Sequence, residues 1–252
     1  MRPFKPIFIL EVIPVLLPYL LVTISIMIGT VLFGGILGLI LAKAKVQKRR
    51  IPKRLADTYI GILRCTPSIV LLFIIFYGLP ELLEAVFGWN INDYNKGIFV
   101  VITFTLIFAA TMAEVMRTAY ESIDKGQHEA AVSVGLTELQ AFYRILLPQG
   151  IVVALPNFSN SLIGLMKEGT LAYTIGLIDI MGKGQLVIGN NYGSYALETY
   201  IALAIIYWGM TIIIEKTFAG IETKLSKGRK NHEMDKRSLR NNRLTKRVKK
   251  VA

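Results

Sequence analysis

Ionisable side chains stand within apolar stretches of this sequence, where a charge is costly. Glu114 and Arg117 lie three residues apart in one such stretch, and Lys167 and Glu168 are adjacent in another. A spacing of three puts Glu114 and Arg117 on one helix face, where they form either a structural ion pair or a ligand contact. Charges inside apolar helices usually pair with each other or mark a pathway. Carrying both signs, these side chains suit a zwitterionic ligand.

Further polar groups accompany these charges. Arg64 precedes the pair Thr66-Pro67, and a proline breaks a helix and frees backbone groups that a ligand could use. Arg64 and Arg117 could instead reach the lipid headgroups. Asn160 belongs to "LPNFSNSLIGLM", where polar side chains also serve hydrogen bonds between packed helices. Instead of contacting a ligand, Lys167 and Glu168 could lie at the outer membrane interface or form a contact between subunits. The candidate ligand-contacting residues are thus Arg64, Thr66, Glu114, Arg117, Asn160, Lys167 and Glu168.

The composition predicts that membrane helices position these residues. The chain has 252 residues, of which 53% are hydrophobic and 18% charged. Membrane-crossing helices need about 20 mostly apolar residues. Five runs meet that length, at 18–42, 58–80, 98–119, 149–171 and 197–219. We therefore expect an all-α integral membrane protein, with no cleaved signal peptide, no internal disulfide because Cys65 is the lone cysteine, and no metal site.

The basic residues predict the topology. Residues 43–54 hold seven Lys and Arg, whereas 81–97 hold one. Because basic loops stay in the cytoplasm, the N-terminus is expected outside and the C-terminus inside. The expected organisation is an interfacial lead-in at 1–17, a transmembrane domain at 18–222 and a basic cytoplasmic tail at 223–252. In the first span, Gly34 and Gly38 are one turn apart and permit close helix packing.

The segment 121–147 reads as two short helices on the cytoplasmic side. Asp124 can cap the first helix, Gly135 can end it, and Thr137 with Gln140 forms a capping box that starts a second. Pro148 marks the joint into the fourth span. A helix-turn-helix could bind DNA, but "ELQAFYRILLP" offers few base-reading side chains and runs directly into lipid, so no nucleic-acid partner is expected.

Several motifs carry a family resemblance. Glu129, Ala130, Ala131, Gly135, Ile145, Leu147 and Pro148 match the E-A-A-x3-G-x9-I-x-L-P loop of ABC importer permeases at every spacing. "RCTPSIVLLFIIFYGLP" and "AEVMRTAYESIDKGQHEAA" resemble segments of the polar amino acid permeases, the group that includes the histidine and glutamine permeases. "IGLIDIMGK" is most similar to L-cystine permeases. The chain is thus identified as a member of this family, with five helices of the MetI-like type.

The resemblance implies roles for particular residues. Glu129, Ala130, Ala131 and Gly135 would dock into a groove of a cytoplasmic ABC ATPase. The family's K-D-T-S-L segment reads Lys167, Glu168, Gly169, Thr170 and Leu171 here, so that Thr170 stands where a pocket hydroxyl is expected although the Thr-Ser pair is changed.

The family also implies partners. They are an ATPase dimer, a second permease that is either identical or different, an external substrate-binding protein and an amino acid substrate. The chain has no G-x-x-x-x-G-K-[ST] phosphate loop, so ATP and Mg²⁺ would be bound by the partner and this chain would be no enzyme and bind no cofactor. A prokaryotic plasma membrane is the expected location. L-cystine is the leading substrate, with basic amino acids, histidine or glutamine as alternatives.

Two other function classes fit the sequence less well. An ion-driven carrier would need its own coupling groups and often has inverted repeats in a longer chain, and none is evident. A membrane scaffold would not need charges within its spans. An amino acid importer subunit therefore accounts for more of the sequence.

Overall fold

The computed structural model describes residues 4–47 and 49–251, with side chains up to residue 226. The described chain is helical and contains no strand. Its helices are α1 (Ile7–Leu16), α2 (Leu20–Val46), α3 (Arg50–Cys65), α4 (Ser68–Phe73), α5 (Leu79–Phe87), α6 (Lys96–Glu121), α7 (Lys125–Ser133), α8 (Glu138–Ala141), α9 (Leu147–Glu168), α10 (Ile180–Asn190) and α11 (Ala196–Val251).

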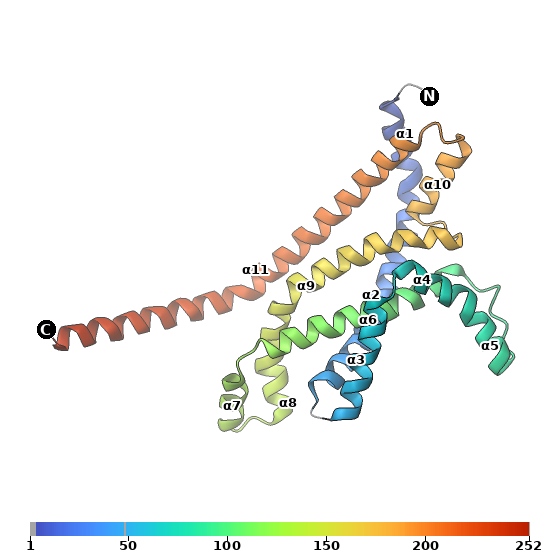
Figure 1. Ribbon diagram of the computed structural model, residues 1–252. Helices are drawn as coiled ribbons and strands as arrows, with labels where there is room; N and C mark the ends of the chain where they lie inside the picture. Colours follow the sequence, from blue (N-terminus) through green and yellow to red (C-terminus); the bar gives the residue numbers. More distant parts are fainter. Residues whose placement is uncertain (1–3, 48, 252) are drawn as a thin grey trace.

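Five helical stretches are long and apolar enough to cross a membrane. They are Ile7–Val46, Ser68–Phe87, Lys96–Glu121, Glu138–Ile175 and Ala196–Ser226. The predicted all-α architecture with five spans is confirmed. In Figure 1, the N-terminus, α1 and α10 lie at the upper end, and α7, α8 and the start of α3 lie at the lower end.

Close packing of α2 on α6 forms the most extensive helix pair. A Cβ built on Gly38 would stand 2.7 Å from the Cβ of Met112, and one on Gly34 would stand 3.0 Å from Cδ1 of Phe108. Glycine is required at both positions because the two backbones approach too closely for a side chain. The predicted role of Gly34 and Gly38 is confirmed.

The largest core lies where α6 meets α4 and α9. It contains buried Leu72, Phe104, Phe108, Met112 and Leu165. The ring of Phe108 packs edge-on against Phe158, with 6.4 Å between centroids. This core fixes the positions of α4 and of the end of α9 relative to α6.

The predicted break at Thr66-Pro67 is present. Both residues are extended, with φ −90° and ψ 125° at Thr66 and ψ 135° at Pro67. The run 58–80 is therefore not one helix, and the apolar candidate span begins only at Ser68. α3 has only 16 residues and is too short to span a membrane by itself, yet its Ile60 packs against Ala110 and Ala113 of α6, which makes it part of the bundle.

A second core joins α1, α10 and α11 through Val12, Leu16, Ile180, Leu203 and Ile206. Asp179 caps α10 by accepting from the Gly182 amide at 2.8 Å and from the Thr23 hydroxyl at 3.3 Å. Burial raises the pKa of the Asp179 carboxyl, against the lowering effect of these hydrogen bonds. Asp179 thus fastens the segment after the fourth span onto α2.

The helical stretch that holds the first candidate span begins before the predicted run at 18–42. Helix α1 starts at Ile7, contains Pro14 and continues into α2 through a short 3-10 turn at Leu17–Tyr19. The interfacial role expected for residues 1–17 stays a prediction. Side chains beyond residue 226 lie outside the described part, and these include the side chains of most of the predicted basic tail at 223–252.

Candidate functional site

The helix break next to α4 lies beside the end of α9. The side chain of Ser68, the first residue of α4, lies close enough to interact with the carboxylate of Glu168, the last residue of α9. Pro67 has no N–H and cannot give the Leu63 carbonyl the partner that a continuous helix would supply. A carboxylate and the polar backbone of a broken helix therefore share one region of the apolar bundle.

The segment around Glu168 adds further polar groups. Glu168 is half-buried, and a 3-10 turn at Gly169–Ile175 follows it. The Thr170 hydroxyl donates to the Lys167 carbonyl at 2.7 Å, and the Thr66 hydroxyl donates to the Ile62 carbonyl at 2.8 Å. Both hydroxyl protons are thus committed to backbone, which leaves the oxygen lone pairs to accept from a ligand ammonium.

The other predicted ligand contacts near this region are exposed in the single chain. They are Arg64, in the last turn of α3, and Lys167 and Asn160 on α9. The structure therefore places Glu168 beside Ser68, which follows Thr66 by two residues, and Arg64 and Lys167 are near them in the chain.

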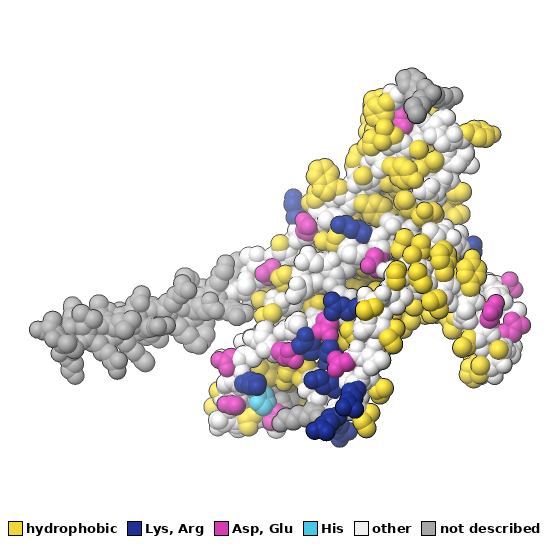
Figure 2. All heavy atoms as spheres, in the orientation of Figure 1, with side chains coloured by type: hydrophobic (Ala, Val, Ile, Leu, Met, Phe, Trp, Pro, Cys, Tyr) yellow, Lys and Arg dark blue, Asp and Glu magenta, His cyan; other side chains and the backbone are white. Residues whose placement is uncertain are grey.

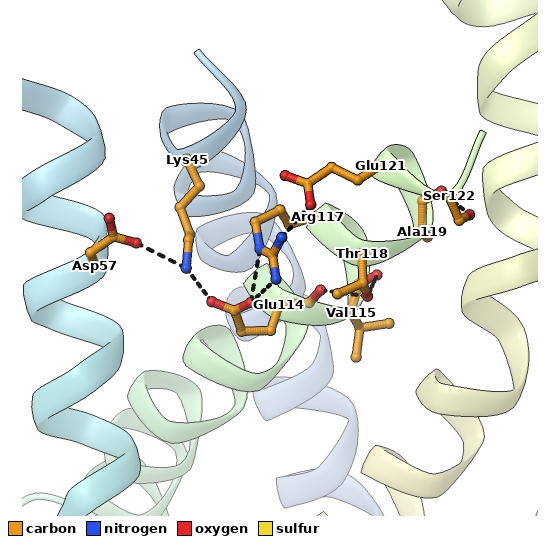
Figure 3. A network of polar contacts seen from close by, with 9 residues as sticks. All are labelled: Lys45, Asp57, Glu114, Val115, Arg117, Thr118, Ala119, Glu121 and Ser122. Atoms are coloured by element: carbon orange, nitrogen blue, oxygen red, sulfur yellow. Dashed lines mark hydrogen bonds and ion pairs between the residues drawn. The ribbon is translucent and has the colours of Figure 1, made fainter. Parts of the chain in front are cut away.

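Glu114 and Arg117 belong to a separate ion-pair network (Figure 3). The Arg117 guanidinium donates to Glu114 at 2.8 and 2.9 Å and also pairs with Glu121. Lys45 of α2 pairs with Glu114 and lies 2.9 Å from Asp57 of α3. The predicted ion pair of Glu114 and Arg117 is present, and a ligand contact by either residue stays a prediction.

This network lies toward the far end of α6 from the segment that follows Glu168. Lys96, in the first turn of α6, donates to the Gly176 carbonyl at 3.4 Å. Glu114 comes 18 residues later on the same helix, or about 27 Å at 1.5 Å per residue. Glu114 and Arg117 are thus grouped with Lys45 and Asp57 and not with the α9 end.

The loop between the third and fourth spans folds as the sequence predicts. Asp124 caps α7 by accepting from the Gly126 amide at 2.8 Å. Gly135, just past α7, has φ +89°, which is the left-handed region that favours glycine. Thr137 and Gln140 form the predicted capping box at the start of α8.

The two short helices are held to each other and run on into the fourth span. His128 of α7 lies 2.6 Å from the carboxylate of Glu138 at the start of α8. After α8, a π-helical turn at Phe142–Leu146 leads without a break into α9, with Pro148 in its first turn. A wide turn suits a following proline, because its missing N–H removes one ordinary helix bond. The loop is therefore mechanically continuous with α9.

Known proteins confirm the family. A model of the family described as binding-protein-dependent transport system inner membrane component matches residues 34–227. This chain is a member of that permease family. It is a transport subunit of the prokaryotic plasma membrane and not itself an enzyme.

Relatives of this permease include named amino acid transporters. The L-cystine transport system permease protein TcyL of Bacillus subtilis is 41% identical over 86% of this chain and 90% of that protein. The probable amino-acid ABC transporter permease protein PatM of Vibrio harveyi is 39% identical over 87% of this chain and 96% of that protein. The identification as an amino acid ABC permease is confirmed.

Solved structures agree on the fold. A crystal structure of an amino acid ABC transporter with histidines matches with a TM-score of 0.76 and 28% identity, over 88% of this chain and all of the other. The MetNI methionine ABC transporter in an inward-facing form matches with a TM-score of 0.62 over 83% of this chain and 94% of the other, but at 18% identity it supports the fold alone.

The permease motif residues take distinct positions on the α7–α8 loop. Glu129 and Ala130 are exposed on α7, Ala131 is buried beneath them, and Gly135 is exposed at the turn. Among the described residues, the Glu129 carboxylate has no hydrogen bond or ion pair. The exposed acid and small side chain leave the outer face of α7 open to a partner.

Sequence reasoning missed the partners of the predicted site residues. Lys45 belongs to the basic run 43–54 that indicates topology, and nothing in its spacing points to Glu114, 69 residues later. Ser68 is separated from Glu168 by 100 residues, and its place after Thr66-Pro67 does not indicate which distant residue it meets. To pair Lys45 with Glu114 from the sequence, one would need to know how α2 and α6 pack against each other.

Proposed function

We propose that this permease imports L-cystine with energy from a separate ABC ATPase. The observation that carries the proposal is the exposed α7–α8 loop, because it presents Glu129 and Ala130 on a helix pair fixed by its own caps and by His128–Glu138. A loop built this way offers a rigid handle to a cytoplasmic partner. Since the sequence has no phosphate loop, ATP and Mg²⁺ would be bound by that partner.

The substrate proposal rests on relatives and on the α9 end. TcyL and TcyB of Bacillus subtilis are L-cystine permeases, at 41% and 33% identity. Glu168 supplies a carboxylate for a substrate ammonium, and Arg64 and Lys167 supply cations for substrate carboxylates. The alternatives are an arginine substrate, as for ArtQ of Bacillus subtilis at 33% identity, or glutamine, as for GlnP of Rickettsia felis at 32%.

The expected partners complete the transport cycle. An ATPase dimer would bind the α7–α8 loops of two permease subunits, and an external binding protein would deliver the substrate. ATP binding would draw the loops together, and the spans would reopen toward the other side, which is a two-state change biased from both ends.

The charge distribution supports a cytoplasmic position for the loop. Lys and Arg side chains gather at the lower end of Figure 2, where α3 starts and the α7–α8 loop lies, whereas hydrophobic side chains cover much of the upper end. Basic ends of membrane proteins stay in the cytoplasm. The ATPase would therefore meet the loop on the side where ATP is available.

Docking is tested by charge reversal of Glu129. We expect E129K to lower co-purification of the ATPase by about tenfold, a loss of roughly 1.4 kcal/mol of binding free energy, while membrane insertion stays intact. E81K, which reverses an exposed acid on α5, is the matched control. G135P should abolish docking, because proline cannot adopt φ +89° or supply the Gly135 N–H to the Val132 carbonyl.

Retention of the ATPase by both E129K and G135P would refute the docking assignment. Loss of the ATPase from E81K to the same extent would show that co-purification reports general damage to the subunit.

A further inference from the structure

Lys45 stands at the junction of three helices. Its ammonium, in the last turn of α2, pairs with Asp57 of α3 at 2.9 Å and with Glu114 of α6. The Lys45 side chain is only 13% exposed and Glu114 only 20%, so the contact is largely shielded from water. Figure 3 shows the ammonium placed between the two carboxylates. Partly buried ion pairs are screened less than surface pairs.

Without the Lys45 ammonium, the electrostatic interaction between α3 and α6 at this place would change from attraction to repulsion. The network holds two cations, Lys45 and Arg117, against three carboxylates, Asp57, Glu114 and Glu121. Without Lys45, Asp57 would face Glu114 with no cation between them, and the remaining carboxylates would repel across the α3–α6 contact. Loss of one partner of a buried pair is costly because it leaves the other charge uncompensated.

Lys43, two residues earlier on α2, offers a contrast. It is exposed, and within the described part of the chain it takes part in no ion pair. Lys43 and Lys45 therefore carry the same charge in different settings. The Lys43 side chain is exposed, whereas the Lys45 side chain joins three helices. An effect that follows removal of the Lys45 charge but not removal of the Lys43 charge is therefore not a general effect of positive charge at this end of α2.

The network also adjoins the start of the α7–α8 loop. Glu121 is the last residue of α6, and Asp124, three residues later, caps α7. Arg117 is bound to both Glu121 and Glu114, so the last two turns of α6 are tied to Lys45 and through it to α2 and α3. A movement of the α7–α8 loop that shifts the end of α6 would therefore also pull on α2 and α3.

We propose that Lys45 is a positioning residue for energy coupling, which makes α3 and the ends of α2 and α6 follow the α7–α8 loop as one body during transport. This inference rests on the proposed function. The lysine contacts neither substrate nor ATPase in this scheme and acts only through Asp57 and Glu114.

The test uses the complete transporter, with its ATPase and binding protein, in proteoliposomes. The variants are K45M, which keeps the length of the side chain without its charge, K45R, which restores the charge, and K43M as the matched control. Cystine uptake and ATP hydrolysis are measured on the same preparation. For K45M we expect uptake per ATP hydrolysed to fall about tenfold, a typical size for a coupling between sites, while ATP hydrolysis continues. K45R and K43M should couple like the unaltered complex.

A second measurement keeps the inference testable if K45M assembles poorly. D57N removes the tie to α3 from a side chain that is 43% exposed, and it leaves Lys45 paired with Glu114. Hydrogen exchange of D57N in the complex should rise at residues 50–57 and remain unchanged at 99–112 of α6. Its uptake per ATP should fall as well.

Normal coupling in K45M or D57N would overturn the inference, and so would equal loss of uptake and hydrolysis in K45M, K45R and K43M. An unaltered complex that hydrolyses ATP but moves no amino acid would refute the proposed function instead, whatever the variants do.

Discussion

Replacement of Gly38 by alanine tests the packing on which the bundle depends. A Cβ at this position would stand 2.7 Å from the Met112 Cβ, 3.1 Å from the Ala109 carbonyl oxygen and 3.3 Å from the Ala113 nitrogen. Two of these atoms belong to the α6 backbone and the third is fixed to it, so none can move away by a rotamer change. α2 and α6 would have to separate by about 1 Å to restore ordinary contact, and a gap of that size forfeits a quarter to a half of each dispersion contact around it.

The expected cost follows from two opposing effects. Overpacking of a rigid contact costs about 1–3 kcal/mol. Alanine also favours a helix over glycine by up to about 1 kcal/mol. Gly35, the residue after Gly34 on the same helix, has no atom within 4 Å of the Cβ position and supplies the control. Because G35A carries the same helix-propensity gain, the difference between G38A and G35A isolates the packing cost, about 1–3 kcal/mol of unfolding free energy.

The assay is reversible unfolding of the purified permease in detergent or bicelles, followed for the unaltered protein, G38A and G35A under identical conditions. We expect G38A to be less stable than G35A by that amount and G35A to equal or exceed the unaltered protein. Equal stabilities for G38A and G35A would refute the close α2–α6 approach.

The remaining predictions concern the α9 end and the cap of α10. Glu168→Gln keeps the shape of the side chain and an acceptor for Ser68 but removes the charge, so we expect amino acid uptake to fall at least about tenfold with membrane insertion and ATPase binding unchanged. Uptake at the level of the unaltered permease would make the carboxylate structural. Gly182→Ala would bring a Cβ within 2.6 Å of the Leu177 carbonyl and should lower the unfolding free energy by about 1–3 kcal/mol. Gly189→Ala on the same helix has open space and is the control; equal stabilities would contradict the tight cap at Asp179.

Local signals predicted much of the fold. The capping box of Thr137 and Gln140, the turn at Gly135 and the break at Thr66-Pro67 each depend on a few neighbouring residues, and all three are present. The close approach at Gly34 and Gly38 was also predictable, because small residues one turn apart have few other uses in a membrane helix. The helical structure of α1 was not predicted, since its prolines indicated a boundary although helices in lipid tolerate them.

Contacts between residues far apart in the sequence limited how much of the candidate site could be predicted. Glu114 and Arg117 could be paired from their spacing, but Lys45 and Asp57 come from two other helices, and only the packing of α2 and α3 on α6 brings them together. The contact between Ser68 and Glu168 likewise depends on tertiary structure. Sequence reasoning therefore named most charged residues of interest but could not tell which of them lie near the end of α9 and which belong to the Lys45 network.

Uptake of labelled L-cystine by cells that lack this permease tests the central claim most directly. Cystine, arginine, histidine and glutamine would be supplied at limiting concentration to deletion cells, parental cells and deletion cells that carry the gene on a plasmid. The account predicts that cystine uptake is lost on deletion and restored by the plasmid, while uptake of the other three is unchanged. Equal uptake of cystine by the deletion and parental cells would contradict it.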